Sequence, residues 1–424
     1  MVEFLKEAAR VVPSKRQLDW FEMERYAFVH YGVNTYTDRE WGEGTEDEKI
    51  FNPTALDCDQ WVEAVKSAGL KGLILTAKHH DGFCLWPSKY TEHSVKNSLY
   101  KGDVVREAAE ACKRGGIKFG FYLSPWDRNS KYYGTPEYND YFCNQLTELL
   151  TGYGDIFCVW FDNACGEGEN GKKQEYDFPR YFELIRKYQP NAVIFNDFGP
   201  DTRWCGNEAG EARHAEWAVV PRELCFYSEV QTGAGPMAED GSLRYMYNTN
   251  REIGTMPNIL YSKGLVFAPA EIDMSIRPGW FWHENEEPHS LERLYNTYLR
   301  SCGANACLNL NVPPTREGKF DERDVKRLKE LGDLIRETTE NRIPCTVERI
   351  GGTPTQPVYE LKTEGPVEIG CVVLREDLTH GQRVEGFRIL GIDEENKADY
   401  ALFEGTCIGN KHICELEDPF AVQN

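Results

Sequence analysis

Apolar and polar positions along this chain follow two periods in turn, which predicts strands and helices in alternation. Short apolar runs rich in β-branched and aromatic residues are typical of strands buried on both faces. Amphipathic stretches that end on glycine or before proline are typical of surface helices. The expected strands are Tyr26 to Gly32, Gly72 to His79, Lys118 to Ser124, Ile156 to Asp162, Ala192 to Asn196, Glu216 to Val220, Glu271 to Ile276 and Ala306 to Asn311. The expected helices are Asp59 to Gly69, Val104 to Gly115, Tyr138 to Leu150, Pro179 to the residue before Pro190, Ser290 to Arg300, and Asp321 to Thr338.

A repeated strand–helix unit predicts a parallel sheet whose faces are covered by helices. About eight strand positions are enough to close a (β/α)8 barrel, which typically needs about 250 residues. An open, doubly wound sheet is the alternative that the pattern leaves open. We therefore expect residues 1–343 to form one α/β catalytic unit of the (β/α)8 type.

The pattern changes after Pro344, where apolar and polar residues begin to alternate. Three such runs, separated by glycine and aspartate turns, are Val358 to Lys362, Val367 to Leu374 and Val384 to Leu390. This predicts an antiparallel C-terminal β-sandwich over residues 344–424. A whole sandwich needs about 100 residues, so the module is expected to be short or incomplete.

The charge and composition of the chain limit the kinds of molecule that it is expected to bind. The net charge of −21 argues against nucleic acid and anionic membranes, and fits a neutral substrate such as a glycan. No apolar run reaches the roughly 20 residues of a membrane helix. The segment Met1 to Arg10 contains acidic residues and lacks the apolar core of a secretory signal, so we expect a cytoplasmic protein unless a leader has been removed.

The 14 cysteines support a reducing compartment. None is arranged as Cys-x-x-Cys, and most stand inside apolar runs, for example Cys112, Cys158 and Cys371. Buried free cysteine behaves as a small hydrophobic residue. We therefore expect structural thiols rather than disulfides or a redox site.

Polar side chains occur where four of the expected barrel strands end, and this is where barrel active sites lie. The strands end in or carry His30, His79 with His80, Tyr122, and Asp162. Neutral imidazoles can donate or accept hydrogen bonds to sugar hydroxyls. The alternatives are that Asp162 caps the next element, that His30 is a core histidine, or that His79 and His80 bind a metal. Adjacent strand residues point to opposite faces, which makes His-His a poor metal pair.

Glycoside hydrolysis usually requires two carboxyl groups, and Asp162 supplies one. The candidates for the other are Glu208, Glu211, Glu216 and Glu271. Glu208 stands in a glycine-flanked loop beside aromatic residues, where its pKa can rise toward the working pH. Glu211 and Glu216 are interpreted as solvated or as partners of Arg213, and Glu271 begins a strand, at the wrong end of the barrel.

Six motifs together resemble the α-L-fucosidases of glycoside hydrolase family 29, in order and at matching intervals over about residues 20–315. They are His30-Tyr-Gly32, Glu40-Trp-Gly42, Lys78-His-His-Asp-Gly-Phe83, Trp160-Phe-Asp162, Gly206-Asn-Glu-Ala-Gly210 and Ser275-Ile-Arg-Pro-Gly-Trp280. The resemblance implies a retaining, barrel-shaped enzyme with a C-terminal β-sandwich. It implies no metal and no organic cofactor.

Carried over by resemblance, Asp162 corresponds to the nucleophile and Glu208 to the proton donor. The fucose-binding residues would be His30, Glu40, His79, His80, Tyr122, Trp160 and Trp280. The form Arg-Trp-x-Gly-Asn-Glu at Glu208 is similar to the subgroup that acts on α-1,3- and α-1,4-linked fucose in branched Lewis-type glycans. Asn163 stands where the family often has glycine, which affects the entrance beside Asp162.

The sequence thus predicts an exo-acting α-L-fucosidase whose partners are fucosylated oligosaccharides. Three alternatives stay open. The first is a broad-specificity or α-1,2/1,6-fucosidase. The second is a metal-dependent hydrolase using His79, His80 and Asp162. The third is a barrel that binds fucose without cleaving it, which would have no need of a second carboxylate.

Overall fold

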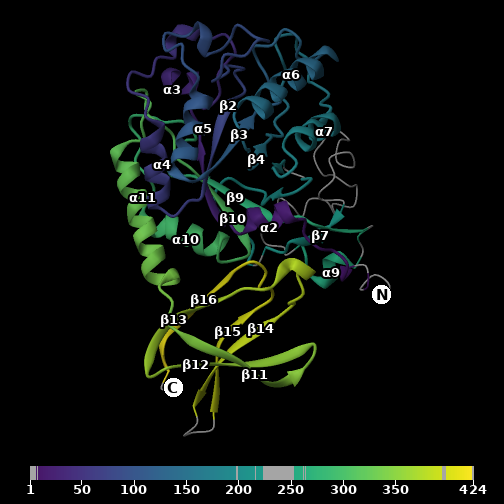
Figure 1. Ribbon diagram of the computed structural model, residues 1–424, viewed down its shortest axis with the longest axis vertical. Helices are drawn as coiled ribbons and strands as arrows, with labels where there is room; N and C mark the ends of the chain where they lie inside the picture. The colour runs from purple at the N-terminus through teal and green to yellow at the C-terminus, as the bar shows by residue number, and fades with distance from the viewer. Residues whose placement is uncertain are drawn as a thin grey trace.

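The chain folds into a helix-covered parallel sheet followed by a set of antiparallel strands (Figure 1). The structure, a computed structural model, describes residues 6, 8–196, 199–214, 216–222, 253–260, 262, 264–393 and 398–422. Residues 1–5 and 7, which belong to the segment expected to lack a secretory signal, lie outside the described residues. The predicted fold class, a (β/α)8-like barrel with a C-terminal antiparallel module, is confirmed.

Eight strands form the barrel sheet in the order β5-β4-β3-β2-β1-β10-β9-β6, and all neighbours in it are parallel. A parallel bridge between Phe195 and Thr202 joins the two outer strands and nearly closes the ring. The open doubly wound alternative is therefore wrong. The strands are β1 Arg25–Val29, β2 Gly72–Lys78, β3 Lys118–Leu123, β4 Cys158–Trp160, β5 Val193–Phe195, β6 Arg203–Trp204, β9 Ala270–Ser275 and β10 Ala306–Asn311.

Helices cover the outside of this ring, because each places one apolar stripe on the sheet and leaves a charged face in solvent. The principal helices are α4 Cys58–Ser67, α5 Val104–Gly115, α6 Glu137–Gly152, α7 Phe178–Tyr188, α10 Leu291–Ser301 and α11 Glu322–Ile335. Shorter elements are α2 Lys15–Phe21, α3 Val33–Thr37, α9 Met256–Ile259, the single turns Glu48–Ile50, Val95–Asn97 and Leu378–His380, and a π-helical turn Arg336–Glu340 after α11.

The sixth barrel strand is not the one that the sequence predicts. Residues 216–220 were expected to supply it, but β7 Val219–Pro221 pairs antiparallel with β8 Leu265–Phe267 outside the barrel sheet. The sixth position belongs to β6, which pairs with β9 and leads directly into the loop of Glu208. A strand of two residues shows no period, so the pattern alone could not identify it.

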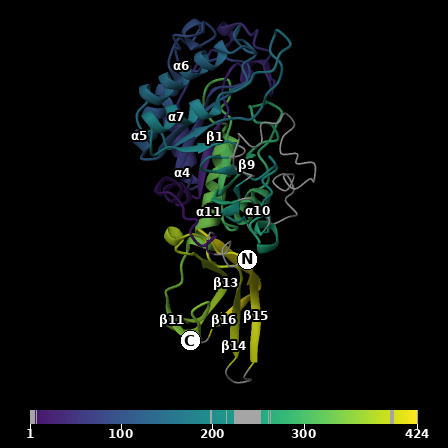
Figure 2. The same cartoon turned by 90° about the vertical axis from the view of Figure 1, so that its right-hand side faces the viewer.

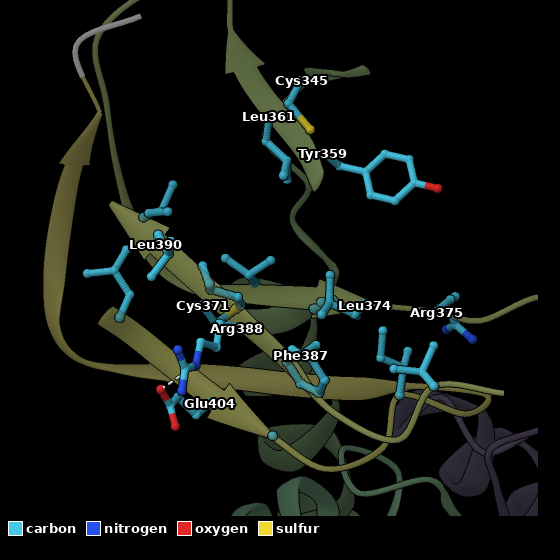
Figure 3. Close-up of a pocket in the computed structure, with 18 of the residues that line it drawn as sticks. Cys345, Tyr359, Leu361, Cys371, Leu374, Arg375, Phe387, Arg388, Leu390 and Glu404 are labelled. Atoms are coloured by element: carbon cyan, nitrogen blue, oxygen red, sulfur yellow. Dashed lines mark ion pairs between the residues drawn. The ribbon is translucent and has the colours of Figure 1, made fainter. Parts of the chain in front are cut away.

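The C-terminal module consists of three separate antiparallel pairs: β11 Cys345–Thr353 with β12 Gln356–Thr363, β13 Val367–Leu374 with β16 His412–Val422, and β14 Phe387–Asp393 with β15 Ala398–Gly405. The pairs surround an open groove of about 3260 Å³, lined in part by Tyr359, Leu361, Phe387 and Leu390 (Figure 3). Ligand pockets usually enclose about 300–1,000 Å³, so the groove is larger than an ordinary small-molecule site. The boundary after residue 343 and the completeness of the module stay predictions.

The module docks on the barrel through charged residues at the amino-terminal ends of the barrel strands (Figures 1 and 2). The residues His30, Tyr122 and Asp162 belong to the opposite, carboxyl-terminal ends. Glu24 immediately precedes β1, and Lys411 donates a 2.8 Å hydrogen bond to its carboxylate, which Arg375 also contacts. The backbone N–H of Asn305, just before β10, donates to the Lys411 carbonyl. Burial alone would raise the pKa of Glu24, but Lys411 and Arg375 lower it to about 2.

No helix in the described part of the chain combines the length and apolarity needed to cross a lipid bilayer. The cytoplasmic location stays a prediction. No disulfide joins two of the cysteines within the described ranges, and most of these cysteines are buried.

Glu24→Gln is expected to destabilise the protein by about 3–5 kcal/mol at pH 7, because it leaves the Lys411 ammonium buried without its counter-charge. A carboxylate with a lowered folded-state pKa contributes stability above its ordinary pKa and loses it as the pH falls toward the folded value. The gap between wild type and variant should therefore shrink between about pH 4.5 and pH 2.

The measurement is the urea midpoint at pH 7 and at pH 3. The matched control is Glu404→Gln, which removes the exposed Arg388–Glu404 pair of the same module and should cost less than about 1 kcal/mol. An equal loss for Glu24→Gln at both pH values would contradict the assignment.

Candidate active site

Asp162 lies two residues beyond β4, at the carboxyl-terminal edge of the barrel. The Tyr122 hydroxyl donates to its Oδ2 at 3.0 Å, and the backbone N–H of Ala164 donates to its Oδ1 at 2.7 Å. His80 Nε2 stands 3.7 Å from Oδ2. These contacts fix both carboxylate oxygens while the side chain stays about a quarter open, at 27% exposure. A nucleophile or base requires this combination of fixed orientation and access.

An aromatic layer supports this carboxylate from inside the barrel. The Trp160 ring stacks on Phe195 at 4.2 Å and packs beside Tyr122 at 5.3 Å. Its indole N–H donates to Glu271 at 2.7 Å, and Asn309 donates to the same carboxyl oxygen. The structure therefore places Trp160 beside Tyr122, and its indole N–H is already bonded to Glu271. Its predicted contact with substrate can only be through the ring.

The three predicted histidines lie together beside Tyr122. His79 lies 5.7 Å from His30 and 4.1 Å from His80, measured between ring centres, and it stacks over Tyr122. Burial lowers the pKa of all three imidazoles, that of His30 to about 3. They are therefore neutral at physiological pH, and each presents one donor and one acceptor nitrogen.

Glu208 reaches the same mouth from the loop after β6. The Trp280 indole N–H donates to its Oε2 at 3.1 Å, and the Trp280 ring lies 5.0 Å from His30. Partial burial raises the pKa of Glu208; the indole N–H lowers it, and the charges of Asp162 and Glu40 raise it further. Two neighbouring carboxyl groups, one of which has a raised pKa, form an arrangement in which that group can act as the acid.

The Glu40 carboxylate binds the backbone of the loop that contains Trp280. Its carboxylate accepts the N–H groups of Trp280 at 2.9 Å and Phe281 at 3.3 Å. His283 contacts it through Nε2 at 2.7 Å and contacts Asp38 through Nδ1, also at 2.7 Å. Burial opposes the charge on His283, but the two carboxylates raise its pKa. We call Asp38, His283 and Glu40 the loop clamp.

The other acids weighed from the sequence have structural partners. Glu216 is fully buried and forms ion pairs with Arg203 and Arg213. The predicted pairing with Arg213 is therefore present. Glu211 is exposed on the loop surface. Glu271 lies inside the barrel, bonded to the Trp160 indole.

Sequence reasoning missed Trp41, although it is part of the Glu40-Trp-Gly42 motif. Its ring is exposed by 59% and meets His80 and Trp126 edge to face at 5.8 and 5.7 Å. An exposed tryptophan at the rim offers an apolar face to a sugar ring. Its position next to Glu40 in the motif could have indicated that it belongs to the site. Nothing in the sequence indicates His283, because only the fold brings it to Glu40.

Within the described ranges, no group of three or more His, Cys, Asp or Glu side chains is arranged to hold a metal ion. The pair His79 and His80, with Asp162, was the sequence alternative for such a site. The Nδ1 atoms of both histidines are already bonded to protein, to Asn34 and Ser124.

His283→Gln is expected to loosen the Trp280 loop in a pH-dependent way. A histidine with a raised pKa contributes fully below its ordinary value, about 6.5, and loses the contribution as the pH rises through the raised value. The amides of Trp280 and Phe281, which bond Glu40, should thus be less protected from hydrogen exchange in the variant at pH 6 and similarly protected at pH 9.

Protection factors corrected for intrinsic exchange provide the measurement. His289→Gln, near the same loop but outside the clamp, is the control and should leave both amides unchanged. Identical pH dependence in wild type and His283→Gln would show that the clamp does not involve the charged imidazole.

Comparison with known proteins agrees with this geometry. The family model for alpha-L-fucosidases matches residues 8–178 and 166–340. Alpha-L-fucosidase 1 of Arabidopsis thaliana is 39% identical over 95% of this chain and 81% of its own length. A glycoside hydrolase 29 family member from an unknown rumen bacterium is 38% identical, with a TM-score of 0.82 over 97% of this chain and 73% of that one.

A Ruminococcus gnavus GH29 fucosidase, solved in complex with fucose, is 29% identical, with a TM-score of 0.81 over 98% of this chain and 90% of its own. Two carboxyl groups at the mouth of a barrel, with a family match over most of the chain, lead to one assignment. The chain belongs to the alpha-L-fucosidase family and is a glycoside hydrolase.

Proposed function

We propose that this enzyme is an exo-acting, retaining α-L-fucosidase that removes α-1,3- and α-1,4-linked fucose from branched, Lewis-type glycans. The observation that carries the proposal is the convergence of Asp162, held by two donors, and Glu208, with a raised pKa, on one mouth lined by neutral histidines.

Asp162 is the nucleophile in this scheme. Its carboxylate attacks the anomeric carbon of fucose, the glycosidic bond breaks, and a covalent fucosyl-enzyme of inverted configuration forms. Tyr122 and Ala164 hold the two oxygens so that the attacking lone pair faces the sugar. Water then displaces Asp162 with a second inversion, which restores the α configuration.

Glu208 is the acid and then the base. It protonates the departing glycosidic oxygen in the first step and accepts the proton of the attacking water in the second. Its raised pKa favours the protonated form that the first step requires. When the covalent intermediate forms, the charge of Asp162 disappears and the pKa of Glu208 falls, which suits the second role.

Fucose is bound by hydrogen bonds and by aromatic faces. His30, His79 and His80 supply hydrogen-bonding nitrogens, while Trp280 and Trp41 supply rings. The Ruminococcus gnavus relative holds fucose in its solved structure, and this supports fucosylated oligosaccharides as the partners of the present chain. A neutral sugar also agrees with a site whose imidazoles are uncharged.

The linkage preference rests on the loop Arg203-Trp-Cys-Gly-Asn-Glu208, whose sequence resembles the Lewis-type subgroup. Asn163, next to Asp162, departs from the glycine frequent in the family and alters the entrance to the leaving-group side. The direct test compares a Lewis trisaccharide with an aryl fucoside and an α-1,2-linked fucoside. Preferential cleavage of the α-1,2 substrate would replace the Lewis assignment, and binding of fucose without cleavage of any substrate would identify a fucose-binding barrel.

Glu208→Ala is expected to slow cleavage of a Lewis trisaccharide by about 10²–10⁴-fold and to slow an activated aryl fucoside far less in the fucosylation step. The reason is that a sugar leaves only when protonated, whereas an activated aryl group leaves unaided. Azide should rescue the aryl reaction and give the α-fucosyl azide. The ratio of kcat/KM for the two substrates is the measurement.

Glu211→Ala is the matched control, because it removes an acid three residues away on the same loop and should not separate the two substrates. Asp162→Asn should lose both reactions. If Glu211→Ala separates the substrates and Glu208→Ala does not, the proton donor is misassigned.

The first product released should be α-L-fucose, because a double displacement inverts the anomeric carbon twice. Proton NMR during the first minutes, before mutarotation, distinguishes the anomers. Initial β-L-fucose would refute the covalent intermediate. A retaining site also requires the two carboxyl groups to approach to about 5–5.5 Å in the complex with substrate.

A further inference from the structure

The three histidines at the mouth present different ring nitrogens as donors. A neutral imidazole carries its proton on one nitrogen, and the hydrogen bond made by Nδ1 decides which nitrogen is left to act at Nε2. Each of the three Nδ1 atoms has one protein partner in this structure: Asn311, Asn34 and Ser124. These partners therefore determine what each Nε2 offers to a ligand.

His30 is fixed as an acceptor at Nε2. Asn311 Oδ1 lies 3.1 Å from the backbone N–H of His30 and 2.9 Å from its Nδ1. The Asn311 amide cannot be turned over, because its Nδ2 donates to the Trp280 carbonyl at 2.7 Å and to Ser275 Oγ at 2.9 Å. An oxygen therefore faces His30 Nδ1, which must carry the proton, and Nε2 is left with a lone pair.

His79 is fixed in the opposite sense. Asn34 Nδ2 lies 3.4 Å from His79 Nδ1 and donates to the Glu40 carbonyl at 3.3 Å. Turning this amide over would place its oxygen against the Glu40 carbonyl oxygen, so the nitrogen faces His79. His79 Nδ1 therefore accepts, and its proton resides on Nε2.

His80 repeats the arrangement of His30 with a different partner. The Ser124 hydroxyl has one proton and donates it to the Trp126 carbonyl at 2.7 Å. Ser124 Oγ can then only accept from His80 Nδ1, which lies at 2.7 Å. His80 Nε2, 3.7 Å from Asp162 Oδ2, is left as an acceptor.

We propose that Asn311, Asn34 and Ser124 are positioning residues that set a mixed pattern of tautomers, with His79 donating through Nε2 and His30 and His80 accepting through theirs. This inference rests on the proposed function for its ligand, the hydroxyl groups of one fucosyl unit.

The pattern has a consequence for recognition. Within the described residues, neither His30 nor His79 has a hydrogen-bonding partner at Nε2, so both atoms are available to the sugar. One sugar hydroxyl must accept from His79, and those that meet His30 and His80 must donate. His80 Nε2 and the Asp162 carboxylate both accept, so a hydroxyl that meets both can give its proton to only one of them.

Nitrogen-15 NMR of the free enzyme at pH 8, with labelled histidine, tests the pattern directly. Single substitutions His30→Gln, His79→Gln and His80→Gln assign the three signals among the nine histidines. The expected spectrum shows the proton on Nδ1 of His30 and His80 and on Nε2 of His79. The same tautomer for all three, or Nδ1–H at His79, would overturn the proposal. This measurement uses no substrate, so it is independent of the proposed function.

A variant tests the effect on binding. Asn34→Asp replaces the donating amide by a carboxylate that only accepts, so neutral His79 must move its proton to Nδ1 and lose its donor at Nε2. We expect KM for an aryl fucoside at pH 8 to rise about tenfold, the value of one hydrogen bond to a buried group, with the His79 NMR signal reversed. Asn311→Asp is the matched control at the NMR level, because it keeps an accepting oxygen for His30 Nδ1, and the His30 tautomer should be unchanged.

Fucosides that lack one ring hydroxyl separate this role from a merely structural one. The Asn34→Asp penalty should vanish for the one deoxy analogue whose missing hydroxyl meets His79, and should persist for the others. A penalty of equal size with every analogue would show that Asn34 only supports the fold. If the wild-type enzyme cleaves no fucoside while the NMR pattern holds, the proposed function fails and the tautomer assignment stands.

Discussion

Burial of polar groups at the carboxyl-terminal edge of the barrel is the constraint on which the site depends. Parallel strands that form a ring bring their ends together, and polar side chains there lose contact with water. Most of them have a partner, because an unpaired buried polar group costs several kcal/mol, although Asn34 Oδ1 has none. The network is the result: Asn311 satisfies His30 and the Trp280 carbonyl, and Tyr122 satisfies Asp162. The same burial that requires these partners keeps the histidines neutral.

The two ends of the barrel use charge for different purposes. At the end where β1 begins, Glu24 and Lys411 form a buried pair that joins the barrel to the C-terminal module. A pair of this kind lowers the pKa of its acid and leaves it ionised. At the other end partial burial raises the pKa of Glu208, and the neighbouring charges of Asp162 and Glu40 raise it further. An acid can catalyse proton transfer only when its proton is exchangeable near the working pH, so the second environment suits chemistry and the first suits stability.

Much of the fold could be predicted from the sequence, since period and length identify a buried strand or an amphipathic helix without tertiary information. The segments Gly72 to His79 and Ala306 to Asn311 became β2 and β10 almost as expected. β6 could not be found, because two residues carry no period, and the pattern predicts the short run Glu216 to Val220 as a strand in its place. The site residues at strand ends could be predicted for the same reason as the strands. His283 and Asn34 could not, because their roles arise from contacts with residues distant in sequence.

Trp280 shows how the parts combine. Its carbonyl is held by Asn311, its backbone N–H by Glu40, and its indole N–H bonds Glu208. Three residues before it, Arg277 is buried and bonded to Asp324 on α11, so the loop is also fixed to the outer helical layer. The position of the proposed proton donor thus depends on the end of β10, on the segment after α3 and on a helix outside the barrel. Since a small displacement of a reacting group is costly to catalysis, selection on the acid must act on this whole set of contacts and not on Glu208 alone.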